Sequence, residues 1–270
     1  VGAGSDEMIM LTTKAFALNS QGMMTVSPTY SLYEIVSSHY GIPFVNVSRG
    51  DQFGFPLEEA CQAARHAAVN WLCVPSNPLG LRDSDQDIEA LLESTDGIVV
   101  IDAAYAEYSG DFWADWVDRH PNLIVLRTLS KAFALAGIRV GYSISSESNT
   151  LRLEAVRPPG SISILSNQIA VRALTHREDM QKRVKQAHIE IRQWEKEFRA
   201  LGFTILQSST NFLLSHVGPH ARQIAQTLMW EKGMVVRSFK EGSQLEEYLR
   251  MSNRNPEDNE RLTQSLKQLL

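Results

Sequence analysis

The sequence predicts an α/β protein in two unequal parts: a three-layer α/β/α large domain with a mainly parallel sheet, and a smaller α+β domain at the C-terminus. Two observations support this prediction. Short apolar runs rich in β-branched residues alternate with helical segments through the first part of the chain. After Pro158 and Pro159 the short apolar runs are followed by a long, charged segment in which apolar residues recur periodically.

The apolar runs predict strands that are buried on both faces. They are residues 71–75, 97–102, 122–128 and 138–144, and each run is close to continuously apolar. Strands have this composition when helices cover both faces of a parallel sheet. Residues 57–68 and 84–92 lie between the runs and are predicted to form such helices.

The periodic segment predicts one amphipathic helix from about residue 169 to residue 201. Its apolar positions recur at three- and four-residue steps: Val184, His188, Ile191, Trp194, Phe198 and Leu201. Shorter strands are expected at 203–207, 210–217 and 233–239, with a closing helix at 257–270. We therefore expect the large domain at 1–175 and the small domain, with its linker helix, at 176–270. The chain opens at Val1 in what reads as the middle of a motif, so we expect the large domain to be incomplete at its N-terminus.

Composition argues against several classes of protein. The formal net charge of −5 and an isoelectric point near 5.8 make nucleic acid an unexpected partner. No apolar run approaches the length of a membrane span, and no signal peptide is visible. Cys61 and Cys73 lack the spacing of a redox or zinc motif, so reduced packing cysteines in a cytoplasmic protein are expected. His216 and His220 are separated by a glycine and a proline, so no metal site is predicted.

Polar residues follow several predicted strands at the point where each strand ends. Asp102 closes one apolar run, Asn77 follows another, and Thr128, Ser130 and Lys131 follow a third. Ligands gather at the carboxyl ends of the strands in open α/β sheets. These side chains are therefore expected at one edge of the sheet, if the strands are neighbours.

Lys131 is the only lysine between Lys14 and Lys182. A lysine becomes a nucleophile or a Schiff-base partner only when its amine can lose a proton, and shelter and nearby positive charge lower its pKa. Arg127 or Arg139 is expected to supply that charge. Taken alone, Lys131 is more often explained as an ordinary solvated lysine after a strand.

Asp102 has two interpretations as well. In isolation it would be a cap for the following helix or turn. The functional interpretation is a buried carboxylate that faces a cationic ring nitrogen and keeps it protonated. Tyr105 could offer its phenol to the same ligand, although a lone tyrosine there is more often a core aromatic.

The stretch Gly2–Glu7, "GAGSDE", precedes a predicted helix at residues 8–18. Free N–H groups at a helix start, aided by the helix dipole, bind anions. A simple turn with Ser5 as N-cap is the alternative. Arg139, Thr128 and Ser130 are compatible with the same anion, since arginine suits bidentate phosphate contacts.

The order of these segments carries more information than any one of them. "GAGSDE", "SPTYSLY", "VPSNPLG", "IDAAYAEY" and "RTLSKAFALAGIRVGY" together resemble the fold-type I pyridoxal-phosphate aminotransferases of class I and II, most closely the histidinol-phosphate aminotransferase group. Leu79 stands where the family's Asn-Pro-Thr-Gly turn has threonine. The resemblance extends to "YLRMS" near the C-terminus.

The resemblance implies pyridoxal 5'-phosphate as cofactor and an aminotransferase activity. Lys131 would bind the cofactor covalently and then move the substrate proton, Asp102 would pair with the pyridine nitrogen, and Tyr105 would complete the catalytic set. Tyr30 would stack on the ring. The implied cofactor-binding residues are Ser5, Asp6, Tyr30, Asn77, Asp102, Tyr105, Thr128, Ser130, Lys131 and Arg139.

Substrate contacts and assembly are implied less completely. Arg250 would grip the substrate α-carboxylate, and Arg237 is either near a distal phosphate or a surface arginine. Arg254 and Asn255 depart from the family's glycine-containing turn. The donor would be histidinol phosphate or a related or aromatic amino acid, the acceptor a 2-oxo acid such as 2-oxoglutarate, and the assembly a homodimer. A decarboxylase of the threonine-phosphate type and a non-catalytic sensor domain of a transcription regulator remain alternatives.

Overall fold

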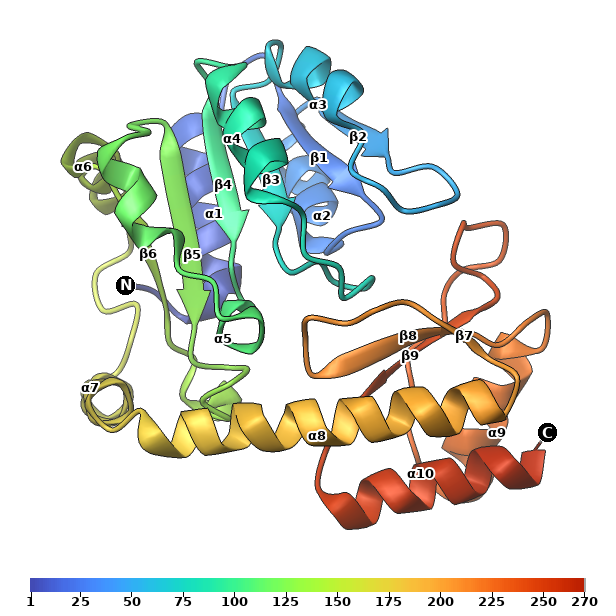
Figure 1. The fold of residues 1–270 in the computed structure, drawn as a ribbon. Coiled ribbons are helices and arrows are strands. Elements are labelled where there is room, and N and C mark those ends of the chain that lie inside the picture. The colour runs from blue at the N-terminus through green and yellow to red at the C-terminus, as the bar shows by residue number, and fades with distance from the viewer. Residues whose placement is uncertain (270) are drawn as a thin grey trace.

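The computed structural model describes residues 1–269 and contains two β-sheets joined by a long helix (Figure 1). The larger sheet has six strands in the order β2-β1-β3-β4-β5-β6. These strands are β1 (Met23–Ser27), β2 (Phe44–Ser48), β3 (Val69–Cys73), β4 (Ile98–Asp102), β5 (Leu123–Thr128) and β6 (Gly141–Ser145). All neighbouring pairs are parallel except β5 and β6. The predicted α/β class with a mainly parallel sheet is confirmed.

The antiparallel direction of β6 follows from the short connection that precedes it. Parallel neighbours need a crossover of a dozen or more residues, usually a helix. The segment between Thr128 and Gly141 holds only a 3₁₀ turn, Ala136–Ile138, so the chain returns along β5 instead. Lys131 lies in this connection, at the edge where β5 ends.

Helices cover both faces of the larger sheet. They are α1 (Gly4–Phe16), α2 (Leu32–Tyr40), α3 (Leu57–Ala64), α4 (Asp85–Glu93), the one-turn α5 (Ala106–Ser109), the 3₁₀ turn Trp113–Asp118 and α6 (Glu147–Val156). Helices α1, α2 and α6 share one core with Val100, and α3 and α4 share another with Val99 and Ile101. Successive strand residues thus point to opposite apolar layers, which explains the uninterrupted apolar runs.

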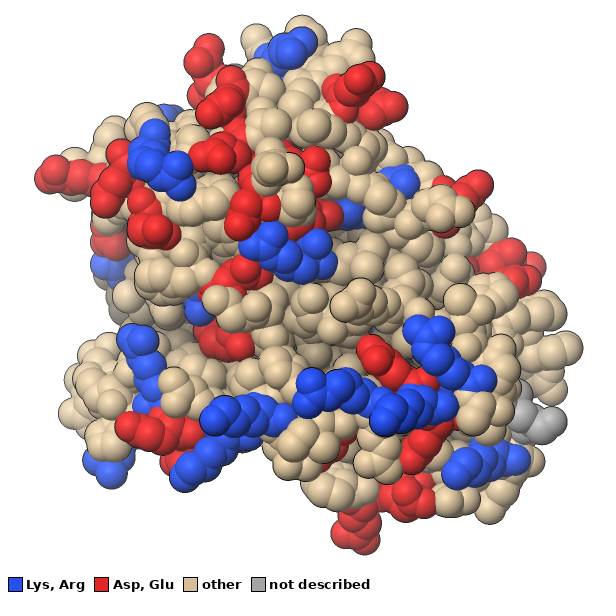
Figure 2. All heavy atoms as spheres, in the orientation of Figure 1, with Lys and Arg blue, Asp and Glu red and all other residues tan. Residues whose placement is uncertain are grey.

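The smaller sheet is antiparallel, in the order β7-β8-β9. Its strands are β7 (Thr204–Ile205), β8 (Phe212–His216) and β9 (Tyr248–Ser252); α8 (Glu178–Ala200), α9 (Ala221–Lys232) and α10 (Pro256–Leu269) pack on it around one core. Helix α8 runs beneath both sheets in Figure 1. A row of lysines and arginines, with acidic residues among them, covers its solvent side in Figure 2, as expected for an amphipathic helix.

Two predicted elements are wrong. The single helix at 169–201 is two helices, α7 (Ile164–Thr175) and α8, because the backbone leaves the helical region at His176 and the Thr175 hydroxyl caps carbonyls of the last turn of α7. Residues 233–239 form no strand. Gly233 ends α9 with φ 64°, and the segment pairs with β9 only through the bridge between Arg237 and Arg250. The domain boundary near residue 175 stays a prediction.

Within residues 1–269 no helix combines the length and apolar character of a membrane span.

Candidate functional site

The polar residues predicted from the strand ends lie along one edge of the larger sheet. Cys73 is level with Asp102, and Asp102 is level with Leu126, so β3, β4 and β5 end side by side. Asn77, Asp102 and the Thr128–Lys131 segment extend from these three ends. The strands are neighbours, as the prediction required.

Asp102 is the buried acid of this edge, with 2% of its surface exposed. Its Oδ2 accepts a hydrogen bond from the Tyr33 hydroxyl at 2.8 Å, whereas its Oδ1 is buried without a partner. Burial raises the pKa of Asp102 to about 6, and the Tyr33 hydrogen bond opposes this effect. A buried carboxylate oxygen without a donor is costly and suits a ligand that brings a proton or a positive charge.

Lys131 has its amine near this acid and retains access to solvent. Its Nζ lies 5.1 Å from the centre of the Tyr105 ring. Desolvation by the surrounding protein lowers the pKa of Lys131, and the positive charge of Arg250 lowers it further. The expectation that Arg127 or Arg139 supplies this charge is wrong. Arg127 is held by Glu107 at 2.8 Å in a buried ion pair, and Arg139 pairs with Asp6 at 2.9 Å.

The start of α1 lies directly against the start of β6. Gly2 and Gly141 exchange two backbone hydrogen bonds of 2.9 and 3.0 Å, and a Cβ on Gly141 would come within 2.6 Å of the Ser5 nitrogen. This close approach brings the N-terminal turn of α1 to the end of β5. There the Ser130 nitrogen donates to the Thr128 hydroxyl at 3.2 Å. Backbone N–H groups and hydroxyls therefore gather at an anion-binding type of helix start.

Asp6 links Arg139 to Tyr30 at this end of the site. The Tyr30 hydroxyl donates to Asp6 at 3.1 Å, and the Tyr30 ring meets the Tyr33 ring edge to face at 5.8 Å. Arg139 has φ 50°, a left-handed conformation that turns the chain back toward β6. Asp6, Tyr30 and Arg139 thus lie together, with the arginine paired with a carboxylate.

The opposite end of the site is where the two sheets meet. Arg250, on β9, donates from Nη1 to the Asn77 side-chain oxygen, and its guanidinium lies 5.1 Å from the centre of the Phe212 ring. Tyr105 meets the same phenylalanine edge to face at 5.3 Å. Burial lowers the pKa of Arg250 and raises the pKa of Tyr105. Asn77, Tyr105 and Arg250 therefore lie close together beside Lys131.

Arg237 belongs to the same region through the backbone. It exchanges hydrogen bonds of 3.0 and 2.9 Å with Arg250 in an antiparallel bridge. Residues that face each other across such a bridge extend their side chains from the same side. Arg237 is exposed and has no ion-pair partner within residues 1–269.

Tyr33 and Phe212 are site residues that the sequence did not identify. Tyr33 is fully buried and stacks on Trp71 with ring centres 4.9 Å apart, which fixes the phenol that holds Asp102. Its signal was its place in the tyrosine-rich stretch "SPTYSLY", three residues after Tyr30. Phe212 had no such signal, because an apolar residue at the start of a strand reads as core.

The residues present fit a pyridoxal-phosphate cofactor on three independent observations. Asp102 offers an unpartnered buried oxygen to a ring N–H, the Gly141 contact holds the N-terminal turn of α1 against the end of β5 where an anion can be bound, and Lys131 has an accessible amine with a lowered pKa. Within residues 1–269 no group of histidine, cysteine and acidic side chains could hold a metal ion, and both cysteines are free.

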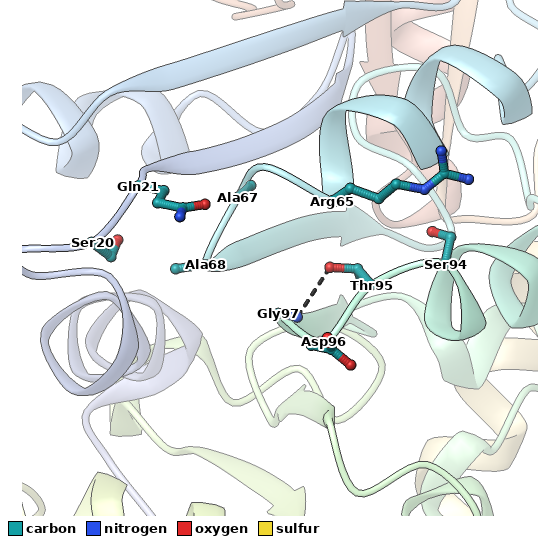
Figure 3. Close-up of a pocket in the computed structure, with 9 residues that line it drawn as sticks. All are labelled: Ser20, Gln21, Arg65, Ala67, Ala68, Ser94, Thr95, Asp96 and Gly97. Atoms are coloured by element: carbon teal, nitrogen blue, oxygen red, sulfur yellow. Dashed lines mark hydrogen bonds between the residues drawn. The ribbon is translucent and has the colours of Figure 1, made fainter.

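A hollow at the other edge of the larger sheet, beside the residues that precede β1, β3 and β4, lacks this chemistry. It has a volume of about 460 Å³ and includes Ser20, Arg65 and Thr95 in its lining (Figure 3). Thr95 is satisfied by neighbouring backbone, since its hydroxyl donates to the Ala64 carbonyl and accepts from the Gly97 N–H. The Arg65 side chain points away from the hollow in Figure 3. It does not compete with the edge described above as the functional site.

Comparisons with known proteins agree with this geometry. The family "Aminotransferase class I and II" matches residues 1–266. A histidinol-phosphate aminotransferase from Caldanaerobacter subterraneus is 33% identical over 273 residues, covering 100% of this chain and 77% of the relative.

Solved structures share the fold. The histidinol-phosphate aminotransferase from Sinorhizobium meliloti, in complex with pyridoxal-5'-phosphate, superposes with a TM-score of 0.90 at 22% identity, covering 100% of this chain and 76% of that one. L-threonine-O-3-phosphate decarboxylase from Porphyromonas gingivalis gives 0.82 at 20% identity, covering 99% and 82%. At these identities the likeness concerns the fold, whereas the family match spans nearly the whole chain. The chain belongs to the class I and II aminotransferases, enzymes that transfer amino groups with pyridoxal 5'-phosphate as cofactor.

Proposed function

We propose that this aminotransferase moves an amino group between histidinol phosphate, or a related or aromatic amino acid, and a 2-oxo acid such as 2-oxoglutarate. The observation that carries the proposal is the bridge between Arg237 and Arg250, which places the two arginines opposite each other, with Arg250 bonded to Asn77. Histidinol phosphate carries a phosphate ester where an amino acid carries its α-carboxylate. Two adjacent arginines suit both anions, because a guanidinium binds carboxylate and phosphate in bidentate fashion.

Lys131 is proposed as the residue that holds the cofactor and moves the proton. Bound pyridoxal phosphate supplies a protonated ring that accepts the electrons released when the Cα–H bond of the substrate breaks. The amine of Lys131, with its pKa lowered by desolvation and by Arg250, is available as the base that removes the Cα proton. A positioned base of this kind contributes a rate factor of about 10²–10⁴.

Asp102, Tyr105 and Asn77 are proposed to set the electronic state of the ring. The free Oδ1 of Asp102 would face the ring nitrogen and keep its proton, while Tyr33 holds the other carboxylate oxygen. Tyr105 and Asn77 would flank the ring oxygen, supported by their place beside Lys131 and Arg250. Tyr30 would stack on the ring.

The start of α1 and the end of β5 are proposed as the phosphate anchor. Ser5, Asp6, Thr128, Ser130 and Arg139 would line it through N–H, hydroxyl and guanidinium groups. Arg139 is already neutralised by Asp6, so its contribution would be to position the turn as well as to bind. Anchoring supplies orientation, which can lower the barrier of a reaction by several kcal/mol.

We also propose that the enzyme is a cytoplasmic homodimer with small-molecule substrates. The support is its resemblance to a family whose sites are completed by the second subunit. Analytical ultracentrifugation of the purified chain tests this: a sedimenting monomer at micromolar concentration, with full activity, would contradict it.

The test of function is a donor screen on the chain reconstituted with pyridoxal phosphate. Histidinol phosphate, phenylalanine and glutamate are added singly, and the loss of absorbance above about 400 nm reports the amino transfer to the cofactor. Histidinol phosphate is expected to be the best donor, and 2-oxoglutarate should restore the starting spectrum. Arg237→Ala should weaken the binding of histidinol phosphate more than the binding of phenylalanine, because only histidinol phosphate carries a phosphate.

The same screen contains the outcomes that contradict the proposal. Release of carbon dioxide from threonine phosphate without transfer to 2-oxoglutarate would replace it by the decarboxylase. Cofactor binding with no spectral response to any donor would favour a sensor domain.

A further inference from the structure

Glu190 is a buried carboxylate outside the catalytic edge. It lies on α8, with 9% of its surface exposed, and within residues 1–269 it forms no ion pair. Its partners are three neutral side-chain amides. Oε1 accepts from Gln186 at 2.8 Å, and Oε2 accepts from Asn253 at 3.0 Å and from Asn259 at 2.8 Å. Burying a charge is unfavourable unless hydrogen bonds compensate, so these three donors hold the carboxylate in one place.

Two of the donors fix the turn that follows β9. Asn253 comes three residues after Arg250, and its backbone N–H donates to the Asn211 carbonyl ahead of β8 at 2.9 Å. Asn259, at the start of α10, also accepts from the backbone N–H of Arg254 at 2.8 Å. Glu190 thus ties both sides of this turn to α8, at the end of the strand that carries Arg250.

Two residues before Glu190, helix α8 contacts α5, which follows β4 of the larger sheet. The His188 ring nitrogen Nε2 lies 2.8 Å from the carbonyl oxygen of Tyr108 in α5, one helical turn beyond Tyr105. Residues two apart on an α-helix point to well-separated sides, roughly 200° around the axis. His188 and Glu190 therefore attach one short stretch of α8 to the two parts that face each other across the site.

We propose that Glu190 is a positioning residue that sets where Arg250 lies relative to Lys131, and hence how tightly an anionic substrate is held. Arg250 reaches Asn77 across the gap between the sheets, so a shift of β9 moves its guanidinium away from the bound substrate. The carboxylate acts as a hydrogen-bond acceptor for the turn and not through its charge on the substrate. This inference rests on the proposed role of Arg250 in anion binding.

The experiment compares four variants of the full chain loaded with pyridoxal phosphate. Glu190→Met replaces the two carboxylate oxygens, which accept the hydrogen bonds, by an apolar side chain of similar length. Glu190→Gln keeps one oxygen for Asn253 and Asn259, while the exposed Gln186 amide can turn to accept from the new amide. Glu197→Met is the matched control, because this acid lies on the same helix and, in the described part of the chain, its side chain accepts a hydrogen bond only from Gln193. Arg250→Ala tests the anion site itself. The probe is maleate, a dicarboxylate that cannot donate an amino group, with its Kd read from the cofactor spectrum.

Glu190→Met should raise the Kd for maleate and the KM for glutamate by about 10-fold or more, since small displacements of a binding group have effects of this size. Absorbance above about 400 nm should remain, because Lys131 is untouched. Glu190→Gln and Glu197→Met should stay within about twofold of the parent.

The outcomes distinguish a failure of the role proposed for Glu190 from a failure of the anion site proposed at Arg250. An unchanged maleate Kd in Glu190→Met, or equal losses in Glu190→Met and Glu190→Gln, overturns the role of Glu190 while that of Arg250 stands. An unchanged Kd in Arg250→Ala overturns the proposed anion site instead. If Glu190→Met does not fold, Asn253→Ala removes one donor from the turn and should weaken maleate severalfold; no change in that variant overturns the inference.

Discussion

The Tyr33 hydroxyl donates to Oδ2 of Asp102 at 2.8 Å while Oδ1 of the same carboxylate stays buried without a partner. One oxygen is therefore held by the protein and the other is free for a ligand. The arrangement opposes the effect of burial, because a hydrogen bond to the ionised form lowers the pKa of an acid that desolvation has raised. The Tyr33 hydrogen bond therefore favours the ionised form of Asp102, which the proposed pairing with the ring nitrogen of the cofactor requires.

Tyr33→Phe should impair catalysis through this carboxylate. Without its donor, Asp102 has a still higher pKa, and activity that requires the ionised acid is lost as pH falls through that pKa. The acid limb of kcat/KM should therefore move to higher pH, with a loss of about 10-fold or more at pH 7, the size expected for a hydrogen bond to a charged group. A pH profile of kcat/KM measures this.

Tyr40→Phe is the control for that substitution, since Tyr40 ends the same helix and its hydroxyl forms no hydrogen bond with any residue of the described range 1–269. Its profile should overlay the parent. An acid limb that is the same in Tyr33→Phe and the parent would show that the phenol does not act on Asp102.

Asp102→Asn should stabilise the protein freed of cofactor while abolishing its activity. The pKa of Asp102 is about 6 in the folded chain and about 3.9 in unfolded chains. Between these values the folded state binds more protons, so the free energy of unfolding falls as pH rises through this window and the penalty is complete above pH 6. Because asparagine cannot ionise, the free energy of unfolding at pH 7 should rise by as much as about 3 kcal/mol, and its dependence on pH should become flatter.

Urea unfolding of the cofactor-free chain between pH 4 and pH 7 measures both effects. The exposed Asp96 provides the control, and Asp96→Asn should leave stability and its pH dependence unchanged. Equal pH dependence in the parent and in Asp102→Asn would refute the assignment of a raised pKa to this acid.

The sequence predicted the sheet edge well because its signals are local. Apolar runs that end in Asp102 or in Thr128 define strands and their ends without knowledge of the rest of the fold. The helix break at His176 was missed because apolar positions continue with helical spacing on both sides of it. The strand predicted at 233–239 failed because β-branched residues favour a strand only where a partner strand is available along their whole length.

The electrostatic partners of the site were harder to predict than its members. Arg127 and Arg139 are near Lys131 in the sequence, yet both are neutralised by Glu107 and Asp6. The cation that affects Lys131 is Arg250, more than a hundred residues away along the chain. Only the packing of the smaller sheet against the larger one brings the two together.

Gly141→Ala should weaken cofactor binding without any change to a functional side chain. The new Cβ would lie 2.6 Å from the Ser5 nitrogen and 2.8 Å from the Gly4 carbonyl oxygen, which are backbone atoms that cannot rotate away. The start of α1 must move, and the anion site moves with it. A lower Tm and a raised Kd for pyridoxal phosphate are expected.

Gly137→Ala is the matched control, because it lies in the same connection between β5 and β6 and a Cβ there meets nothing within 4 Å. It should bind cofactor like the parent. Equal cofactor affinity in the two alanine variants would show that the contact between Gly141 and the α1 start does not shape the site.

Lys131→Ala should abolish turnover together with the absorbance of the lysine-bound cofactor above about 400 nm. The fold should remain, because the residue retains access to solvent and its side chain forms no hydrogen bond or ion pair within residues 1–269. Lys182→Ala, on the exposed side of α8, should match the parent in both readouts. Lys131→Arg separates charge from chemistry: the cation is kept, but a guanidinium stays protonated and cannot act as the base. Arginine should therefore fail like alanine, and appreciable turnover in either variant would mean that another amine carries the cofactor.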